Sequence, residues 1–187
     1  MNKIDQKLLS LQACNPEILE ELRPYLSLHH YPKGTVISHR TPADPVLYYL
    51  EKGLLISIRI KAGICYVCRA ATEGFLFPNT DIPDVQDAYF RLLEESFIWS
   101  VNLNQVKVLA QRNPRLLLMY IELLEEELKQ SRTQEMQLRI PNAGLRFREY
   151  AAGNGSLVYK LNNETLAGLL NISKNHLFKI RKQFLRS

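Results

Sequence analysis

The chain has 187 residues, of which 46% are hydrophobic and 23% are charged, and its formal net charge is +5. These proportions are typical of a globular protein and exclude a disordered or fibrous chain. No stretch approaches the ~20 consecutive apolar residues of a membrane-spanning helix, and the N-terminal segment lacks the uninterrupted apolar region of a signal peptide. We therefore expect a cytoplasmic protein without a membrane partner.

The first third of the sequence changes from a helical to a strand pattern. Residues 3–28 have apolar side chains at helical spacing, and Asn15 with Pro16 is typical of a helix start. Short runs rich in Val, Ile, Tyr and Leu then predict strands at residues 35–38, 46–50, 54–60, 64–69 and 96–102. Strands at this spacing predict a small antiparallel barrel or roll, with Gly53 and Gly63 at turns that need a positive φ.

Two helices are predicted between and after these strands, a short one at residues 86–93 and another at 105–112. The longest helical pattern begins at Pro114 and ends before Pro141, because proline cannot continue a helix. Its coiled-coil-like seam consists of Leu117, Ile121, Leu124 and Leu128. The helix could pack only on its own domain, or it could also pair with a partner helix. The apolar stripe is wide enough to contact the chain's own roll on one side and a twin helix on the other.

The C-terminal part is markedly basic. From Asn142 onward the chain has eight basic and two acidic residues, whereas the preceding 141 residues have sixteen basic and seventeen acidic ones. We predict a helix up to about Ala152, a Gly-Asn-Gly turn, an extended piece ending at Leu161 and two short amphipathic helices. The charge asymmetry indicates a terminal module that binds a polyanion.

The last two helices have the construction of a helix-turn-helix. Asn171 occupies the turn, where a left-handed backbone is needed, and Ser173 is placed to cap the second helix. The predicted inward side chains are Leu166, Ala167, Leu169, Leu170, Ile172, Leu177, Ile180 and Phe184. The alternative is an ordinary helical hairpin with a solvated basic face. We favour DNA binding because all these residue types fall at the spacing that the motif requires.

The order of roll, long helix and terminal helix-turn-helix resembles the Crp/Fnr superfamily of bacterial transcription regulators. The stretch "PKGTVISHRTPADPVLYYLEKGLLISIRI" is similar to the family's roll, and "TLAGLLNISKNHLFKIRKQF" resembles its recognition unit. The resemblance implies an α+β fold, with an antiparallel β-roll (a double-stranded β-helix) and flanking helices in residues 1–113. A long dimerisation helix with a hinge would follow in residues 114–141, and a DNA-binding helix-turn-helix domain in residues 142–187.

The resemblance also implies a homodimer on double-stranded DNA, joined through Leu117, Ile121, Leu124 and Leu128. Base edges would be contacted by Lys174, Asn175 and Lys179, and the phosphate backbone by Ser173, His176, Arg181 and Lys182. Phe178 and Lys179 depart from the Ser-Arg pair usual in the family, so the fork of arginine is lost and Phe178 could contact a thymine methyl group. RNA polymerase is a candidate further partner.

Members of the family that bind cyclic nucleotides hold the phosphate with an Arg-Ser or Arg-Thr pair inside the roll. Alignment at the start of the long helix places Gln86 and Asp87 at this pair, and no arginine occurs from Ala70 to Phe90. A buried phosphodiester needs a cation, and a carboxylate would repel it. We therefore expect a degenerate phosphate site that has lost cAMP and cGMP, and leave open an uncharged or cationic small-molecule effector, or none.

The sequence gives no indication of a cofactor, a metal site or an enzyme. Cys65 and Cys68 lie three apart in a predicted strand, so their thiols should point to opposite faces as partly buried structural residues. An iron–sulfur cluster also needs about four cysteines. A cupin-like enzyme would need clustered His and Glu ligands in the strands, which are absent from the sequence of these segments.

The function predicted from the sequence is a dimeric, sequence-specific DNA-binding transcription regulator of the Crp/Fnr type. The alternative is a regulatory module that binds a cyclic-nucleotide-like or other small molecule and acts on a protein partner. The basic C-terminus favours the first.

Overall fold

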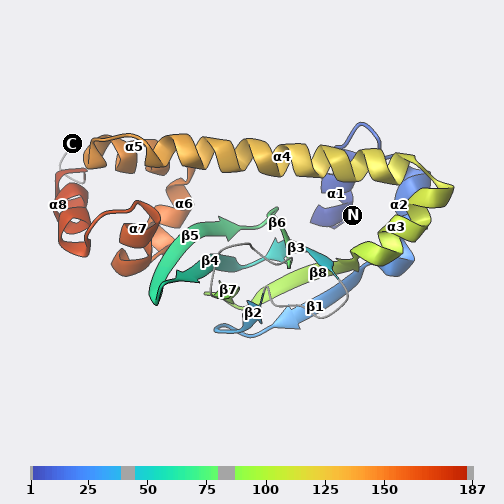
Figure 1. Ribbon diagram of the computed structural model, residues 1–187, viewed down its shortest axis with the longest axis horizontal. Helices are drawn as coiled ribbons and strands as arrows, with labels where there is room; N and C mark the ends of the chain where they lie inside the picture. Colours follow the sequence, from blue (N-terminus) through green and yellow to red (C-terminus); the bar gives the residue numbers. More distant parts are fainter. Residues whose placement is uncertain (1, 39–44, 80–86, 185–187) are drawn as a thin grey trace.

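The computed structural model describes residues 2–38, 45–79 and 87–184, with the side chain of Phe184 excepted. In Figure 1 the chain begins with small helices, forms a two-sheet roll, runs along that roll as one long helix, and ends in a cluster of short helices at the far end. The predicted α+β architecture with an antiparallel roll is therefore confirmed.

The N-terminal helices are shorter than the sequence pattern suggests. They are α1 (Lys3–Leu9) and α2 (Pro16–Leu22), followed by a 3-10 turn, η1 (Arg23–Tyr25). The predicted helix start is confirmed, because the Asn15 side chain accepts a hydrogen bond from the amide of Ile18 and Pro16 is the first helical residue. The helical region ends before residue 28, since strand β1 (Ser27–Tyr31) pairs along its whole length with β8.

The roll consists of two four-stranded antiparallel sheets. One sheet has the order β1-β8-β3-β6 and the other the order β2-β7-β4-β5. The remaining strands are β2 (Val36–Ser38), β3 (Val46–Lys52), β4 (Leu54–Lys61), β5 (Ile64–Thr72), β6 (Leu76–Pro78), β7 (Asp87–Leu92) and β8 (Ser96–Asn102). All five predicted strands are present, and three further strands, β1, β6 and β7, were not predicted from the sequence.

The helix predicted at residues 86–93 is wrong within the described residues, because Asp87–Leu92 form strand β7 between β2 and β4. Ala88, Phe90 and Leu92 alternate with more exposed residues, which is the period of a strand. The pairing of β7 on both sides supplies backbone hydrogen bonds that a helix would have made within itself.

Two glycines make the turns as predicted. Gly53 has φ of +127°, and a Cβ there would lie 2.2 Å from Oγ of Ser96, so both the backbone and the space require glycine. Gly63 has φ of +74° and follows Ala62 at +51°, which forms the two-residue turn between β4 and β5.

After β8 the chain forms α3 (Leu103–Arg112) and the long helix α4 (Arg115–Leu138), which ends before Pro141 as predicted. Leu116, Met119 and Leu123 are buried on one side of α4 against the N-terminal helices and the roll. Within the described segments, no helix combines the length and the apolar character that a membrane crossing needs.

The C-terminal unit contains α5 (Ala143–Gly153), α6 (Gly155–Lys160), α7 (Asn163–Leu169) and α8 (Lys174–Phe184). The extended piece predicted before Leu161 is wrong, because residues 155–160 are helical. Leu157 and Val158 are both buried although they are neighbours in sequence. Both side chains can be buried because two adjacent positions of a helix can face the same interior. In a strand, adjacent side chains point to opposite faces, so one of the two would be exposed.

The buried residues form three clusters, and one of them joins the roll to the C-terminal unit. Leu54, Ile56 and Ile58 of β4 pack in the same cluster as Phe147 of α5 and Leu166 of α7. The predicted boundary at residue 142 therefore separates two units that share a hydrophobic core.

Candidate nucleic-acid interface

The turn between α7 and α8 is built by local backbone chemistry. Asn171 has φ of +50°, the left-handed conformation that the sequence predicts. The amide of Ile172 donates to the carbonyl of Ala167 at 3.0 Å, and the amide of Asn171 donates to that of Gly168 at 3.1 Å. These two bonds define a Schellman motif, which satisfies the last carbonyls of α7 and sends the chain off at a fixed angle.

The second helix starts where the sequence indicates. Oγ of Ser173 accepts a hydrogen bond from the amide of His176 at 3.2 Å, so Ser173 is the cap of α8. Leu177 is fully buried and Ile180 is 7% exposed, and both pack with Leu166 and Ala167. The predicted inward face is confirmed at these positions, while the Phe184 side chain lies outside the described residues.

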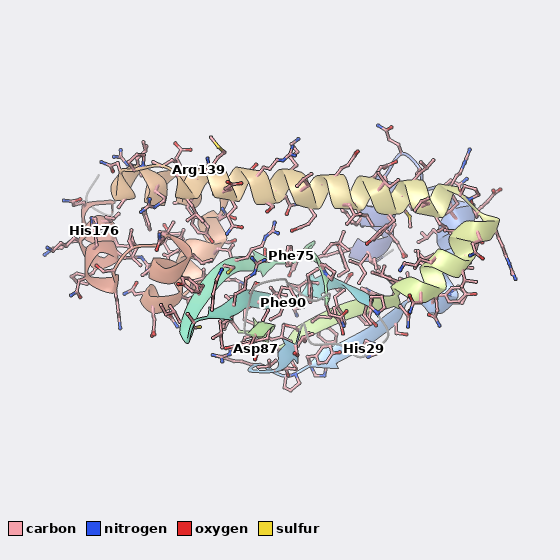
Figure 2. All side chains as sticks on the ribbon, viewed as in Figure 1. His29, Phe75, Asp87, Phe90, Arg139 and His176 are labelled. Atoms are coloured by element: carbon pink, nitrogen blue, oxygen red, sulfur yellow. The ribbon has the colours of Figure 1, made fainter. Side chains whose placement is uncertain are left out.

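The opposite face of α8 is exposed and carries most of the predicted contact residues. They are Lys174, Asn175, His176, Lys179 and Lys182, with Ser173 exposed at the cap. In Figure 2 the labelled His176 lies at the end of the molecule remote from the N-terminal helices and points away from the roll. A flat or grooved polyanion could therefore approach this face along the direction of α4.

Arg181 differs from its neighbours in α8. It is half-buried, and its guanidinium donates to the carbonyl of Val158 at 2.5 Å and to the side chain of Asn163. These bonds tie α8 to α6 and α7. The sequence suggested a phosphate contact for Arg181 because lysine and arginine look equivalent on a basic face, and no sequence signal distinguishes an inward guanidinium.

The helix-turn-helix is seated on the outer surface of the roll. Helix α7 packs on β5, and a Cβ added at Gly168 would lie 3.2 Å from Cγ2 of Val67. An ion pair also joins α6 to the roll, since Nζ of Lys160 lies 3.2 Å from the carboxylate of Glu94. In Figure 1 α7 lies between α8 and β5, and Lys174, Asn175 and Lys179 of α8 remain exposed.

The predicted dimer seam lies along the side of α4 opposite its buried residues. The four seam residues are exposed by 52%, 41%, 47% and 50% in the order Leu117, Ile121, Leu124 and Leu128. Leu118 and Met136, at 53% and 65%, extend this apolar surface and were not among the predicted residues. A single chain thus leaves uncovered a helix face of the kind that normally packs against another helix.

Aromatic rings fill the inside of the roll. Phe77 is 1% exposed, with its ring centroid 5.1 Å from that of Tyr48, 5.6 Å from Phe75 and 4.5 Å from Phe90. Gln86 of the predicted degenerate phosphate site lies outside the described residues. Asp87 begins strand β7, where its carboxylate accepts from the amide of Ala88 at 2.9 Å.

A cavity of about 430 Å³ separates this aromatic cluster from α4, and two arginines that the sequence analysis missed line it. Arg69 lies over the ring of Phe75 at 4.5 Å, and its guanidinium pairs with Glu127 of α4. Burial raises the pKa of the Glu127 carboxyl, an effect that Arg69 opposes. The second arginine that lines this cavity is Arg59 of β4. Strand alternation was the available signal for Arg59, since Ser57 and Arg59 of β4 both line the cavity, whereas Cys68 and Arg69 of β5 line it although they are adjacent in sequence.

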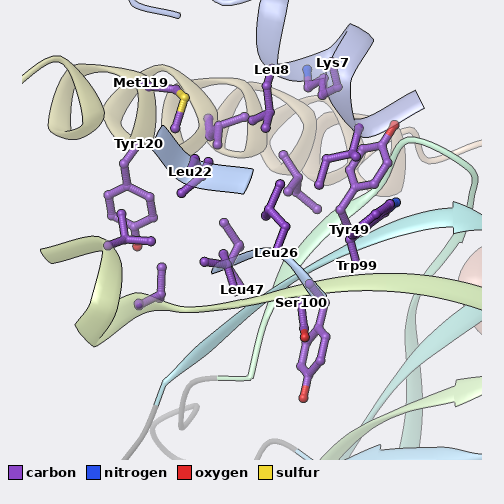
Figure 3. A pocket seen from close by; sticks show the side chains of 17 residues that line it. Lys7, Leu8, Leu22, Leu26, Leu47, Tyr49, Trp99, Ser100, Met119 and Tyr120 are labelled. Atoms are coloured by element: carbon purple, nitrogen blue, oxygen red, sulfur yellow. The ribbon is translucent and has the colours of Figure 1, made fainter. Parts of the chain in front are cut away.

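A second, smaller cavity lies between α1, α2, α4 and the other sheet. Figure 3 shows Leu8, Leu22, Leu47 and Met119 converging on it. Its volume of about 40 Å³ is close to that of one water molecule, and its accessible lining is apolar. This space is a packing gap in the hydrophobic core and offers no polar recognition to a ligand.

The cysteine thiols are free at all three positions. Cys68 is half-buried and lines the larger cavity, whereas Cys65 is exposed near the turn of the β4–β5 hairpin, so the prediction that both are partly buried is wrong for Cys65. The end of the hairpin extends beyond the helices that cover the rest of β5. Within the described ranges, no group of three or more His, Cys, Asp or Glu residues is arranged to hold a metal ion.

Comparison by sequence identifies no relative of the chain. No family model matches it, and no curated protein matches its sequence.

Comparison by structure identifies many similar folds. FixK2 from Bradyrhizobium japonicum is 12% identical with a TM-score of 0.69, and the match covers 86% of this chain and 85% of FixK2. CLP from Xanthomonas campestris, a c-di-GMP responsive global regulator, is 15% identical with a TM-score of 0.63 and 92% coverage of both chains. A protein from Eubacterium rectale assigned to the crp/fnr family of transcriptional regulators is 13% identical with a TM-score of 0.66, covering 92% and 84%. The predicted resemblance to this superfamily is thus confirmed for the fold.

Proposed function

We propose that the chain is a dimeric, sequence-specific DNA-binding transcription regulator. The observation that carries this proposal is the face of α8, where lysines and an asparagine are exposed on a helix fixed by the Asn171 turn and the Ser173 cap. A cationic, exposed second helix after such a turn fits the major groove of B-DNA. The regulators CLP and the Eubacterium protein, with which this chain shares its fold, support the assignment.

Within α8 we assign base contacts to Lys174, Asn175 and Lys179. Lysine donates to guanine O6 or N7, and asparagine can bind adenine through two hydrogen bonds. Phosphate contacts are assigned to Ser173, His176 and Lys182, which are exposed around the same face. Arg181 takes a different role, since its guanidinium holds α8 against α6 and α7.

The dimer forms through the exposed seam of α4. Parallel pairing of two α4 helices would cover the exposed residues Leu117, Ile121, Leu124 and Leu128. It would also place the two α8 helices at the same end of the assembly. A two-fold axis between them then presents two recognition faces to successive major grooves, ~34 Å apart. RNA polymerase would be the cytoplasmic partner of such a regulator.

The roll of this regulator does not bind cyclic nucleotides. The aromatic rings of Phe75, Phe77 and Phe90 occupy its interior. Of the two arginines that line the cavity, Arg69 is paired with Glu127, and Arg59 is the other. A phosphodiester in the cavity would have to displace that carboxylate. An uncharged small molecule fits the cavity of about 430 Å³ without breaking the Arg69–Glu127 ion pair.

The experiment that tests this function is selection of bound duplexes from a random-sequence pool by the full chain, followed by Kd measurements over a range of salt. For about six to ten phosphate contacts per dimer, affinity should fall about 10³–10⁵-fold between about 50 and about 200 mM salt. Failure to select any duplex, or a Kd that does not change with salt, would overturn the proposal. Addition of cAMP or cGMP should leave the Kd unchanged.

A further inference from the structure

The exposed face of α8 contains one large apolar side chain. Phe178 is 62% exposed, although its neighbour Leu177 is fully buried and Ile180 is 7% exposed. Asn175, Phe178, Lys179 and Lys182 follow the spacing i, i+3, i+4 and i+7, so they form one stripe along the helix. We call these four residues the recognition stripe. Phe178 is its apolar member.

Exposed apolar residues are common on protein surfaces and usually need no explanation. The position of Phe178 is what distinguishes it, because the exposed residues Lys174, Lys179 and Lys182 lie on the same side of α8. The ring is not needed for the core of the C-terminal unit, which Leu166, Leu170 and Leu177 fill. Covering this ring with an apolar group would be favourable, and the surrounding lysines favour a partner that is also a polyanion.

Base edges in the major groove offer one such group. The 5-methyl of thymine is the apolar feature of the major-groove code, and side chains contact it by apolar packing. Alternative modes fit less well, since aromatic stacking needs unpaired bases and apolar wedges enter from the minor groove, which does not admit a helix of this width.

The spacing along α8 fixes which base pair is involved. Residues three apart rise by about 4.5 Å along a helix, and successive base pairs are about 3.4 Å apart. Asn175 and Phe178 therefore reach neighbouring base pairs when α8 lies along the groove. Lys179, about 1.5 Å further on and rotated to the other side of the stripe, reaches toward the following pair.

We propose that Phe178 is a specificity-determining residue that contacts the 5-methyl group of a thymine, in the base pair next to the adenine that Asn175 contacts. The inference rests on the proposed DNA-binding function and adds to it the composition of the half-site. Each half-site contains two successive A·T pairs, oriented so that one thymine methyl faces Phe178.

Deoxyuridine substitution tests this directly, because deoxyuridine pairs like thymine and lacks only the methyl group. An operator selected by the full chain is remade with each thymine replaced in turn, and Kd is measured for each duplex. The wild type should lose about fourfold in affinity at one thymine per half-site, as expected for one buried methyl group. The Phe178→Ala variant should bind the thymine and deoxyuridine operators equally.

The control is Tyr159→Ala, which removes an aromatic ring that is 74% exposed on α6 of the same unit. It should keep the fourfold sensitivity to deoxyuridine. The inference is overturned if the wild type tolerates deoxyuridine at every position, or if Phe178→Ala remains sensitive at the same thymine. If no operator is selected at all, the proposed function itself fails, and the two failures are thus distinguishable.

Discussion

Val67 of β5 and Gly168 of α7 meet where the helix-turn-helix contacts the roll, and a Cβ at Gly168 would lie 3.2 Å from Cγ2 of Val67. This approach lets α7 lie on β5 and lets Leu54, Ile56 and Ile58 share a core with the C-terminal helices. A Cβ at Gly168 would be in tighter than ordinary van der Waals contact, so the Val67 side chain would have to shift by a few tenths of an ångström to admit it. The helix-turn-helix is therefore positioned by the roll as well as by α4.

Enlarging Gly168 should disturb this contact. Gly168→Val places two methyl groups against Val67, and overpacking of this kind costs about 1–3 kcal/mol in the free energy of unfolding. Chemical denaturation measures it, and Val67→Ala in the same chain should restore part of the loss. Gly153→Ala is the matched control, because a Cβ there meets open space and should not destabilise the protein. Equal effects at both glycines would contradict the close contact.

Arg181 and Lys182 are neighbours with separable roles. Arg181→Ala should lower the free energy of unfolding by about 1–3 kcal/mol, because it leaves the carbonyl of Val158 without its charged donor. Lys182→Ala should leave stability unchanged and weaken binding to all DNA sequences similarly, with a shallower salt dependence. Chemical denaturation measures the stability of both variants, and Kd titrations measure their binding to DNA. An Arg181→Ala protein of unaltered stability would return Arg181 to the phosphate contacts.

Lys179→Ala should reduce operator binding by about tenfold or more, because a base contact accounts for about 1–3 kcal/mol of discrimination. Binding to random duplex should weaken much less. The Kd for the operator and the Kd for random duplex, measured at one salt concentration, give the ratio of specific to non-specific binding. Lys107→Ala removes an exposed lysine of α3, remote from α8, and should change neither value. Equal losses on both DNAs would move Lys179 to the phosphate contacts.

Leu124→Glu should convert the dimer into monomers, since it places a charge in the centre of the proposed α4 seam. Sedimentation velocity distinguishes the two species. The control is Val108→Glu, which adds the same charge at an apolar residue of α3 that is 57% exposed and off the seam. A Leu124→Glu protein that still sediments as a dimer would exclude this seam.

Tyr150→Phe should stabilise the protein by about 1 kcal/mol. Within the residues that the structure describes, the Tyr150 hydroxyl is buried without a hydrogen-bond partner, and removing it relieves that cost. A thermal melt measures the gain. Tyr159→Phe, at an exposed tyrosine, should have no effect. A loss of stability in Tyr150→Phe would show that the hydroxyl makes a favourable interaction.

The same hydroxyl predicts a dependence on alkaline pH. Burial raises the pKa of Tyr150 to about 12 from an ordinary value of 10.0. Because the folded pKa is raised, titration of this hydroxyl leaves the free energy of unfolding unchanged below pH 10 and lowers it as the pH rises from 10 toward 12. Denaturation at several pH values should show a smaller loss in Tyr150→Phe than in the wild type. The variant should still lose some stability at alkaline pH, because the pKa of Tyr49 is also raised to about 12.

Local signals were sufficient for the parts of the chain that fold by local chemistry. Asn171 adopts the predicted left-handed backbone, Ser173 caps α8, and Gly53 and Gly63 make the predicted turns, because each feature depends on a few neighbouring residues. The same reasoning was wrong for β7 and for α6. A short apolar run fits both the two-residue period of a strand and the 3.6-residue period of a helix. Contacts with the rest of the protein then decide between strand and helix.

The sequence by itself determined an antiparallel barrel or roll, the long helix and the basic face of the last helix, since periodicity, capping residues and charge are properties of adjacent positions. The α+β class with a roll came from the family resemblance. The tertiary structure alone decided that β7 is held between β2 and β4 and that Arg69 is paired with Glu127. It also turned Arg181 inward and seated α7 on β5. These outcomes depend on contacts between residues far apart in the chain, where packing space and burial select the partner.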